Sequence, residues 1–199
     1  ANFNKVIEVY CEDGKFDQAA KFYKQIAEMA EEEKDIPTAV ANYEQAATMF
    51  LNGNKEIDSN NCLLKVAGLV CESNDLMKAA EIYEAQGKSC LKRKLGQHAA
   101  KGHFFQAVLL YMAMGDSVSA AQKVEGFMGL DHLFTTSREC DFLKKLLAAW
   151  DAYDLQAFQD ACQDWDRITP LDGWKMDMLT KTKAHIQEMA GGAEEVDLC

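Results

Sequence analysis

The stretch Asp35-Ile36-Pro37-Thr38-Ala39-Val40-Ala41-Asn42-Tyr43 combines a helix start with the small and aromatic residues of a packed helix face. Pro37 fits the first turn of a helix, where its missing N–H leaves no hydrogen bond unmade. Val40 and Tyr43 begin an apolar stripe with the i, i+3, i+4 spacing of an amphipathic helix. The stretch therefore predicts a helix over 37–52.

The same order of a turn residue, an apolar residue, a small pair and a larger apolar or aromatic residue recurs along the chain. Its four copies begin at Asp13-Gly14, Asp35-Ile36, Asp75-Leu76 and Gly115-Asp116, and their small pairs are Ala19-Ala20, Ala39-Val40, Ala79-Ala80 and Ala120-Ala121. One helix with its turn takes about 20 residues, so the repeating unit is a helical hairpin of about 40 residues. Because small residues let neighbouring helices approach, the repeat predicts a stack of antiparallel hairpins similar to tetratricopeptide repeats (TPR-like).

Composition agrees with an all-α protein and narrows the function classes. Pro occurs only 2 times in 199 residues, and Ala and Leu outweigh the β-branched residues. The net charge of −11 argues against nucleic acid as a partner. No apolar run is long enough to span a bilayer. The 7 Cys contain no C-x-x-C pair and are interpreted as reduced thiols, which predicts a cytoplasmic protein.

Ten helices are predicted from this patterning. Their ranges are 2–12, 15–34, 37–52, 56–73, 75–92, 95–114, 116–127, 137–152, 154–167 and 171–189. Asp75, Asp116 and Asp154 are expected to cap helix N-termini, and Gly53 and Gly115 to end helices. Pro170 is expected to separate the last two helices.

The chain is divided on the same grounds into three regions. Residues 1–130 form the helix-hairpin repeat region, and residues 131–189 form a C-terminal helical bundle. Residues 190–199 follow the pair Gly191-Gly192 and are acidic, so they are expected to form a flexible tail.

No local motif predicts catalysis, a metal or a cofactor. Gly87-Lys88-Ser89 resembles the end of a phosphate-binding loop, but Ile82 stands where that loop needs a glycine. His98 and His103 are spaced five apart, which does not suit one helix face, and no acid or Cys completes a ligand set. The chain is therefore expected not to be an enzyme.

Basic residues offer two readings. Lys15, Lys21, Lys65 and Lys101 belong to helices of the repeat region, with further lysines between them. They either cover solvated helix faces or form a positive stripe on one side of a solenoid, suited to an acidic partner. Composition leaves both open.

Five strings in order resemble the α-type soluble NSF attachment proteins. They are Ala39-Val40-Ala41-Asn42-Tyr43-Glu44-Gln45-Ala46-Ala47, Asn61-Cys62-Leu63-Leu64-Lys65-Val66-Ala67-Gly68, Ala100-Lys101-Gly102-His103-Phe104-Phe105-Gln106-Ala107, Ser137-Arg138-Glu139-Cys140 with Lys144-Lys145-Leu146-Leu147, and Ile168-Thr169-Pro170-Leu171-Asp172-Gly173-Trp174. The resemblance covers nearly all of this chain and about the C-terminal two-thirds of the family.

The resemblance implies a fold and an adaptor function. The fold would be a twisted right-handed superhelix of antiparallel hairpins with a C-terminal helical bundle. The partners would be the SNARE four-helix bundle of syntaxin, synaptobrevin and SNAP-25 type and the hexameric ATPase NSF, which disassembles it. Such an adaptor would act in vesicle fusion and ER–Golgi transport, in the cytoplasm and peripherally on membranes.

The resemblance also implies site residues. Lys15, Lys21, Lys65 and Lys101 would meet the acidic SNARE surface, whereas Asn61 stands where the family usually has a lysine. The NSF contacts would be Arg138, Asp151, Glu194, Glu195, Asp197 and Leu198. The family carries a glutamate cluster after Lys-Lys-Leu-Leu, and here Ala148 and Ala152 replace most of it. The alternative is a TPR-like scaffold that binds SNAREs or other acidic helical partners without activating the ATPase.

Overall fold

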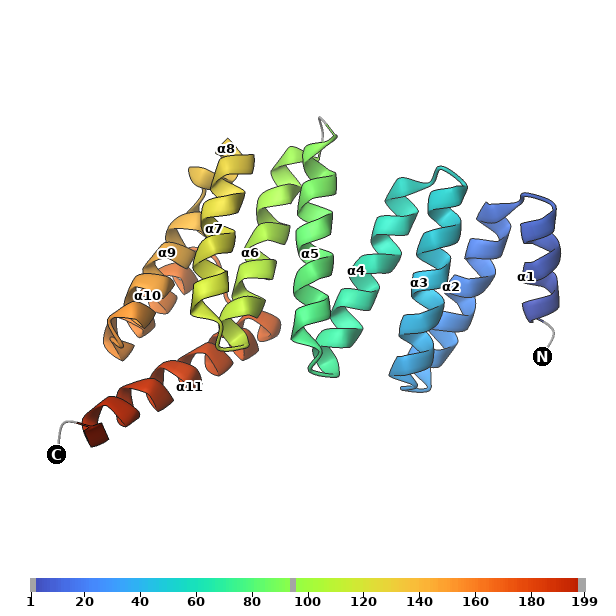
Figure 1. Cartoon of the computed structure of the whole chain (residues 1–199). Helices are drawn as coiled ribbons and strands as arrows, with labels where there is room; N and C mark the ends of the chain where they lie inside the picture. Colours follow the sequence, from blue (N-terminus) through green and yellow to red (C-terminus); the bar gives the residue numbers. More distant parts are fainter. Residues whose placement is uncertain (1–2, 94–95, 197–199) are drawn as a thin grey trace. The chain divides into compact units, whose positions relative to one another are not determined.

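A computed structural model describes residues 3–93 and 96–196, the side chains of Asn4 and of residues 192–196 excepted. The described residues form helices joined by short turns, without strands (Figure 1). The helices are α1 (Phe3–Glu12), α2 (Phe16–Glu32), α3 (Ile36–Asn52), α4 (Glu56–Glu72), α5 (Leu76–Leu91), α6 (Gln97–Ala113), α7 (Ser117–Leu130), α8 (His132–Thr135), α9 (Arg138–Asp151), α10 (Leu155–Asp166) and α11 (Gly173–Val196). The all-α prediction and the ten predicted helices are confirmed. Sequence patterning missed α8, because four residues are too few to show a period.

Six of the turns between the described helices share one backbone conformation, which explains the regular spacing of these helices. Residues in the left-handed region occur at Gly14, Lys34, Asn54, Asn74, Gly115 and Tyr153, and the first four are 20 residues apart. The residue after each donates its N–H back to the last turn of the preceding helix, as Lys55 does to the Phe50 carbonyl at 2.8 Å. This bond ends the helix in a Schellman-type turn. The next helix follows at once, so consecutive helices run antiparallel.

The three predicted aspartate N-caps are confirmed. The carboxylate of Asp116 accepts a hydrogen bond from the Ser119 N–H at 2.8 Å, and those of Asp75 and Asp154 act in the same way. Pro37 lies in the first turn of α3. Gly115 ends α6 with φ +83°, whereas at the end of α3 the left-handed residue is Asn54 rather than Gly53.

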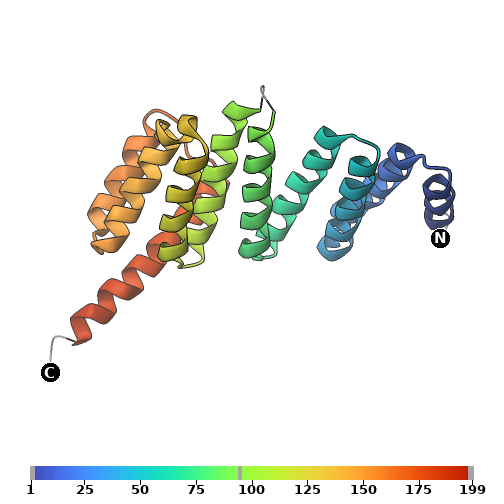
Figure 2. The same cartoon turned by 45° about the horizontal axis from the view of Figure 1, so that its top comes forward.

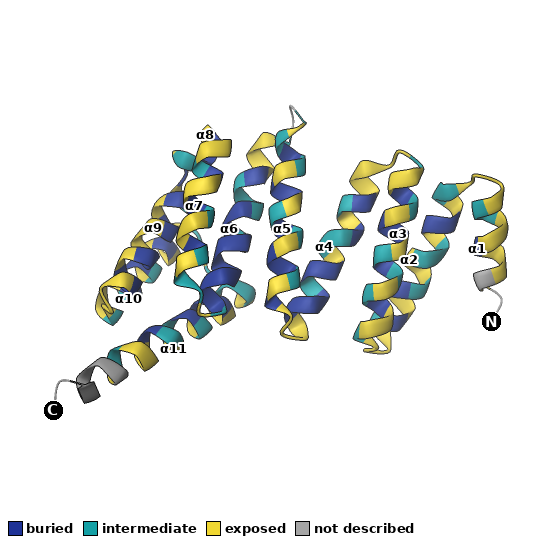
Figure 3. Ribbon diagram, in the orientation of Figure 1, coloured by how far each residue is buried: buried dark blue, intermediate teal, exposed yellow. Residues whose placement is uncertain are grey.

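Contacts divide the chain into two compact units, Ala1–Ile82 and Tyr83–Cys199, and the division falls within α5. In the first unit α3 packs against both α2 and α4. Its core is built from small residues with Tyr43 among them, all fully buried: Ala19, Ala20, Ala39, Tyr43, Ala46, Val66, Ala67, Ala79 and Ala80. Figure 3 shows buried stretches along α2, α3 and α4. The small pairs thus allow the close packing that the repeat predicts.

The second unit is built around α6, which packs against α7, α8, α9 and α11. Every residue from Ala107 to Ala113 is buried, as expected for a helix with neighbours on all sides. The ring of Phe104 stacks on Phe127 at 4.2 Å between centroids and meets Phe134 edge-on. Of the fourth small pair only Ala120 is buried, since Ala121 faces solvent.

The end of the chain departs from the predicted tail. Helix α11 continues through Gly191 and Gly192 to Val196, so the expected helix end at 189 is wrong (Figure 2). Glycine costs about 1 kcal/mol in a helix but does not forbid it, and the neighbouring Ala and Glu residues favour helix. Residues 197–199 lie outside the described part of the chain. The predicted division at 130/131 stays a prediction.

Candidate functional site

Basic side chains in the first unit border a pocket of about 230 Å³. Lys24 and Glu28 reach it from α2, Asp58, Asn61, Cys62 and Lys65 from α4, and Tyr43 and Phe50 from α3 beneath. Lys21 lies one helical turn before Lys24 on the same side of α2. The pocket therefore lies at the centre of an exposed face that carries both acidic and basic side chains. The parallel helices α2 and α4 form this face, and α3 packs against both.

A hydrogen-bond network fixes Lys65 at this pocket. Its ammonium lies 3.0 Å from the Glu31 carboxylate of α2, and the buried Tyr43 hydroxyl donates to the same carboxylate at 2.7 Å. The Tyr43 bond, and then the Lys65 bond, hold the pKa of Glu31 below its usual value. Burial, and then the Glu31 bond, raise the pKa of Tyr43. The network ties α2, α3 and α4 together, while Lys65 keeps 57% of its side chain exposed.

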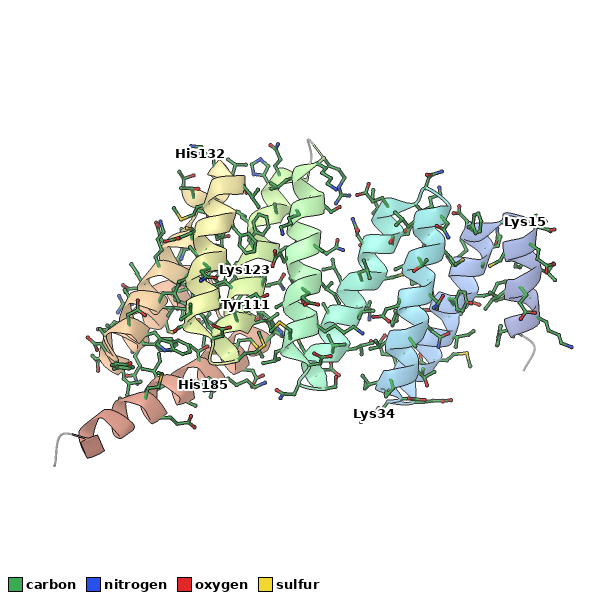
Figure 4. All side chains as sticks on the ribbon, viewed as in Figure 1. Lys15, Lys34, Tyr111, Lys123, His132 and His185 are labelled. Atoms are coloured by element: carbon green, nitrogen blue, oxygen red, sulfur yellow. The ribbon has the colours of Figure 1, made fainter. Side chains whose placement is uncertain are left out.

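The other predicted cations of this unit lie apart from that network. Lys15 precedes α2 and forms an ion pair with Asp13 at 2.8 Å, which raises the pKa of its ammonium (Figure 4). Lys21 is exposed and has no ion pair with a described side chain. Lys24 lies 3.6 Å from Glu28 on the same helix. Of these three lysines only Lys24 lines the pocket together with Lys65; Lys21 lies one helical turn before Lys24, and Lys15 does not line the pocket.

In the second unit Lys101 and Arg138 lie on helices that pack together. The ammonium of Lys101 on α6 lies 3.2 Å from the carboxylate of Glu139 on α9. The guanidinium of Arg138 stands 4.7 Å above the Trp165 ring and donates to the Thr169 hydroxyl at 2.8 Å. Arg138 is thus a positioned cation rather than a freely rotating one, since it is held by a cation–π contact and a hydrogen bond.

The acidic residues predicted at the C-terminal end are only partly described. Asp151 is exposed at the last residue of α9. Glu194 and Glu195 belong to the last turns of α11, and their side chains are not described. Asp197 and Leu198 lie outside the described residues. Asp151 lies 13 residues from Arg138, which is about 20 Å along α9, so these two residues do not share one point of contact.

Other polar contacts stabilise the second unit. Glu84 of α5 accepts from Lys88 at 2.6 Å and from Lys123 of α7 at 2.5 Å. Burial works against ionisation of Glu84, but the two lysines outweigh it and hold its pKa below its usual value. Lys123 also stands 5.4 Å over the Tyr111 ring, and Figure 4 shows the two side chains together. This cluster fastens α7 to α5 and α6.

Sequence reasoning missed the acids that accompany the predicted lysines. Glu31 lies 34 residues from Lys65 and Glu139 lies 38 residues from Lys101, so no short-range pattern could identify either pair. The pairing of Lys24 with Glu28 could have been predicted from the sequence, because Glu28 follows Lys24 by four residues, the spacing of ion pairs on one helix face.

The described residues contain neither a membrane-spanning helix nor a metal-binding cluster of side chains. None of the helices in the described ranges has the length and apolar character required to cross a bilayer. No cluster of His, Cys, Asp and Glu among the described side chains could hold a metal ion. Gly87, the glycine of the rejected phosphate-loop string, lies inside α5.

Comparison with known proteins finds one matching family model and several similar proteins. A family model described as "Soluble NSF attachment protein, SNAP" matches residues 1–187. The chain is 36% identical over 184 residues to the alpha-soluble NSF attachment protein of Mus musculus and 37% over 185 residues to the beta-soluble NSF attachment protein of Bos taurus, in each case over 92% of this chain and 62% of the relative. It is 33% identical over 195 residues to the vesicular-fusion protein SEC17 of Komagataella phaffii, over 96% of this chain and 66% of that protein. The chain thus spans about 62% of the length of the first two relatives.

Proposed function

Because the chain belongs to the soluble NSF attachment protein family, we propose that it is an adaptor that binds assembled SNARE complexes and recruits the ATPase NSF for their disassembly. The family match over residues 1–187 carries this proposal. As an adaptor of vesicle fusion and intracellular transport it would work in the cytoplasm and on membranes only peripherally. Its part is to bind and position, and the chemical work belongs to the ATPase.

The basic residues would meet the SNARE bundle of syntaxin, synaptobrevin and SNAP-25 type. Lys21 and Lys65 are exposed on the parallel helices α2 and α4, and Lys101 is half-buried on α6. Lys65 already has a carboxylate partner in Glu31, so an acidic SNARE side chain would share an ammonium whose position is fixed. Preorganised side chains lose less conformational entropy on binding. Lys15 is proposed as a peripheral contact, since it is exposed and paired with Asp13.

The C-terminal end would engage NSF. Arg138 is held over Trp165, and Asp151 is exposed at the end of α9. Glu194, Glu195 and Asp197 would steer the C-terminus onto a basic surface of the ATPase, where Leu198 fills an apolar site. Burying one leucine contributes about 1.5–3 kcal/mol, enough to shift an equilibrium tenfold or more.

A charge-reversal experiment tests the SNARE contact. The variant carries Lys21→Glu, Lys65→Glu and Lys101→Glu, and its control carries Lys5→Glu, Lys34→Glu and Lys92→Glu at exposed lysines elsewhere, so the net charge changes equally. Affinity for an assembled SNARE bundle should fall by several-fold to about a hundredfold in the first variant only. The wild-type affinity should also fall between 0.1 M and 1 M salt, since the Debye length shrinks from about 10 Å to about 3 Å. Equal binding by the two variants would contradict the proposed contact.

A second experiment tests NSF recruitment. Leu198→Ala should leave SNARE binding unchanged and lower the NSF-dependent disassembly rate. Binding of the SNARE bundle without any stimulation of NSF by the wild-type chain would instead identify a SNARE-binding scaffold.

A further inference from the structure

A pocket of about 240 Å³ lies between α10 and α11, both in the second unit. Helix α11 runs obliquely to α10 (Figures 1 and 2), and two helices that diverge from their crossing leave a wedge between them. None of the residues proposed above to contact SNAREs or NSF lines this pocket. The lining residues are Phe158, Gln159, Cys162, Gln163, Leu171, Met176, Leu179, Thr180 and Lys183.

The interior of the pocket is apolar. Phe158 and Leu179 are buried in its walls, and Leu171 and Met176 add aliphatic surface. The hydroxyl of Thr180 donates to the Met176 carbonyl at 2.7 Å, so this hydroxyl is already satisfied within α11. A hydrocarbon chain that enters the pocket therefore covers apolar surface without leaving the Thr180 hydroxyl unpaired.

The pocket carries a single charged side chain. Lys183 is the one charged residue among those that line it, and it forms no ion pair with a described side chain. The positions three and four residues from it along α11, which are residues 179, 180, 186 and 187, hold no acid. An anionic group could therefore bind Lys183 without displacing a carboxylate of this chain.

Acids that adjoin lining residues in the sequence point elsewhere or are paired. Asp160 and Asp164 line pockets on the α9 side of α10. Asp177 forms an ion pair with Lys181 at 3.1 Å. Lys183 thus gives the pocket a local positive charge in a chain whose net charge is −11.

The wall beside Lys183 is uncharged. Burial raises the pKa of the Cys162 thiol to about 11, although Lys183 acts in the opposite direction. The thiol is therefore protonated at pH 7, and it presents a small apolar surface to the pocket.

The apolar and charged parts lie at different ends. Lys183 is seven residues after Met176, which is about 10 Å along α11. Leu171 lies before the start of α11, on the Met176 side. An elongated ligand would thus place its apolar end near Leu171 and Met176 and its charged end near Lys183.

We propose that this pocket binds a free medium-chain fatty acid, with its hydrocarbon chain between α10 and α11 and its carboxylate on Lys183. The volume is suitable, since an apolar cavity of roughly 150 Å³ holds benzene and this pocket is larger. A stable protein partner would need a wider surface, of about 800 Å² on each side. The single cation selects an anion over a neutral or cationic molecule with the same chain.

NMR titration of the full chain with octanoate tests this proposal. Octanoate should bind at least about tenfold more tightly than hexanoate, because two further methylene groups are buried. It should also bind several-fold more tightly than 1-octanol, and octyltrimethylammonium should not bind. Lys183→Gln should reduce the affinity for octanoate to that for 1-octanol, whereas Lys181→Gln, which changes the net charge equally on the same helix, should leave it unchanged.

Alkylation of Cys162 locates the ligand. Iodoacetamide labelling in mildly alkaline buffer, followed by peptide mass spectrometry, should show that octanoate slows the reaction of Cys162. The partly exposed Cys11 in the first unit is the matched control, and its rate should not change. Thr180→Trp fills the pocket and should abolish octanoate binding, whereas Gln187→Trp, at an exposed position of α11 outside the pocket, should preserve it, with circular dichroism showing both variants folded.

Three results would overturn the proposal: no binding of octanoate, equal binding of octanoate and octyltrimethylammonium, or equal protection of Cys162 and Cys11. Protection of Cys162 by phosphatidylserine vesicles but not by octanoate would assign the pocket to a membrane lipid and overturn it as well. These measurements use neither SNAREs nor NSF, so their outcome is independent of the adaptor function.

Discussion

Replacing Gly87 by alanine should destabilise the second unit, although alanine is the better helix former. Gly87 is buried inside α5, and an added Cβ would lie 2.4 Å from Cε1 and 2.6 Å from Cδ1 of the Phe104 ring. The ring is fully buried and stacked on Phe127 at 4.2 Å, so it has no space in which to withdraw.

Two opposing effects set the magnitude. Alanine in place of glycine stabilises a helix interior by about 1 kcal/mol. Forcing a methyl group into a packed core costs about 1–3 kcal/mol and sometimes more. The shortest contact is at least 1 Å shorter than ordinary van der Waals contact at 3.4–4 Å, so the upper part of that range of cost applies. The net loss of unfolding free energy is expected to be about 1–2 kcal/mol, since the two effects subtract.

Thermal and urea unfolding, followed by circular dichroism, measure this effect. A net loss of about 1–2 kcal/mol lowers Tm by roughly 2–8 °C in a chain of this size. Gly126→Ala is the matched control, because Gly126 lies exposed inside α7 with nothing within 4 Å of its added Cβ. That variant should be stabilised by up to about 1 kcal/mol. Gly87→Ala should cost less unfolding free energy in a Phe104→Leu background than in the wild type, because the two positions are in contact.

A result of the same sign for both glycine variants would refute this reasoning. If Gly87→Ala were as stabilising as Gly126→Ala, the close approach of α5 to the Phe104 ring would be wrong. If Gly87→Ala cost as much in the Phe104→Leu background as in the wild type, the Phe104 ring would not be the cause of the loss.

Three further predictions concern polar contacts. Tyr43→Phe should lower the unfolding free energy by about 1–3 kcal/mol, because a part-buried hydrogen bond to the Glu31 carboxylate is lost. Urea unfolding measures this loss, and an unchanged midpoint would contradict it. The pKa of Glu84 lies below its usual 4.5 in the folded chain, so the stability that ionised Glu84 contributes is present above pH 4.5 and is lost as the pH falls below it. Glu84→Gln should therefore flatten the decline of Tm below pH 4.5. Parallel curves of Tm against pH for the variant and the wild type would contradict this prediction. Asp116→Ala should lower the unfolding free energy by about 0.5–2 kcal/mol through loss of the α7 N-cap. Asp177→Ala, in the second turn of α11, removes only an exposed ion pair with Lys181 and should cost less, so calorimetry of both variants separates the cap from a general effect of charge.

Local sequence determined the helices and their turns. The left-handed residues at 14, 34, 54 and 74, and the capping carboxylates of Asp35 and Asp75, depend only on neighbours within about one helical turn. Hence ten helices and three capping aspartates were predictable. The expected break at Gly191-Gly192 was wrong because glycine permits helix as well as ending it, and flanking residues then decide.

Contacts between helices were decided only by the tertiary structure. The sequence indicated Lys65 and Lys101 as exposed cations, but the carboxylates of Glu31 and Glu139 meet them because packing brings different helices together. The sequence likewise showed Ala148 and Ala152 in place of acids, but these residues line a pocket of about 440 Å³ only because α10 packs beside α9. Backbone hydrogen bonds act over a few residues and can be read along the chain. The pairing of side chains far apart in sequence follows from how the helix faces pack, which depends on the shapes of many residues at once.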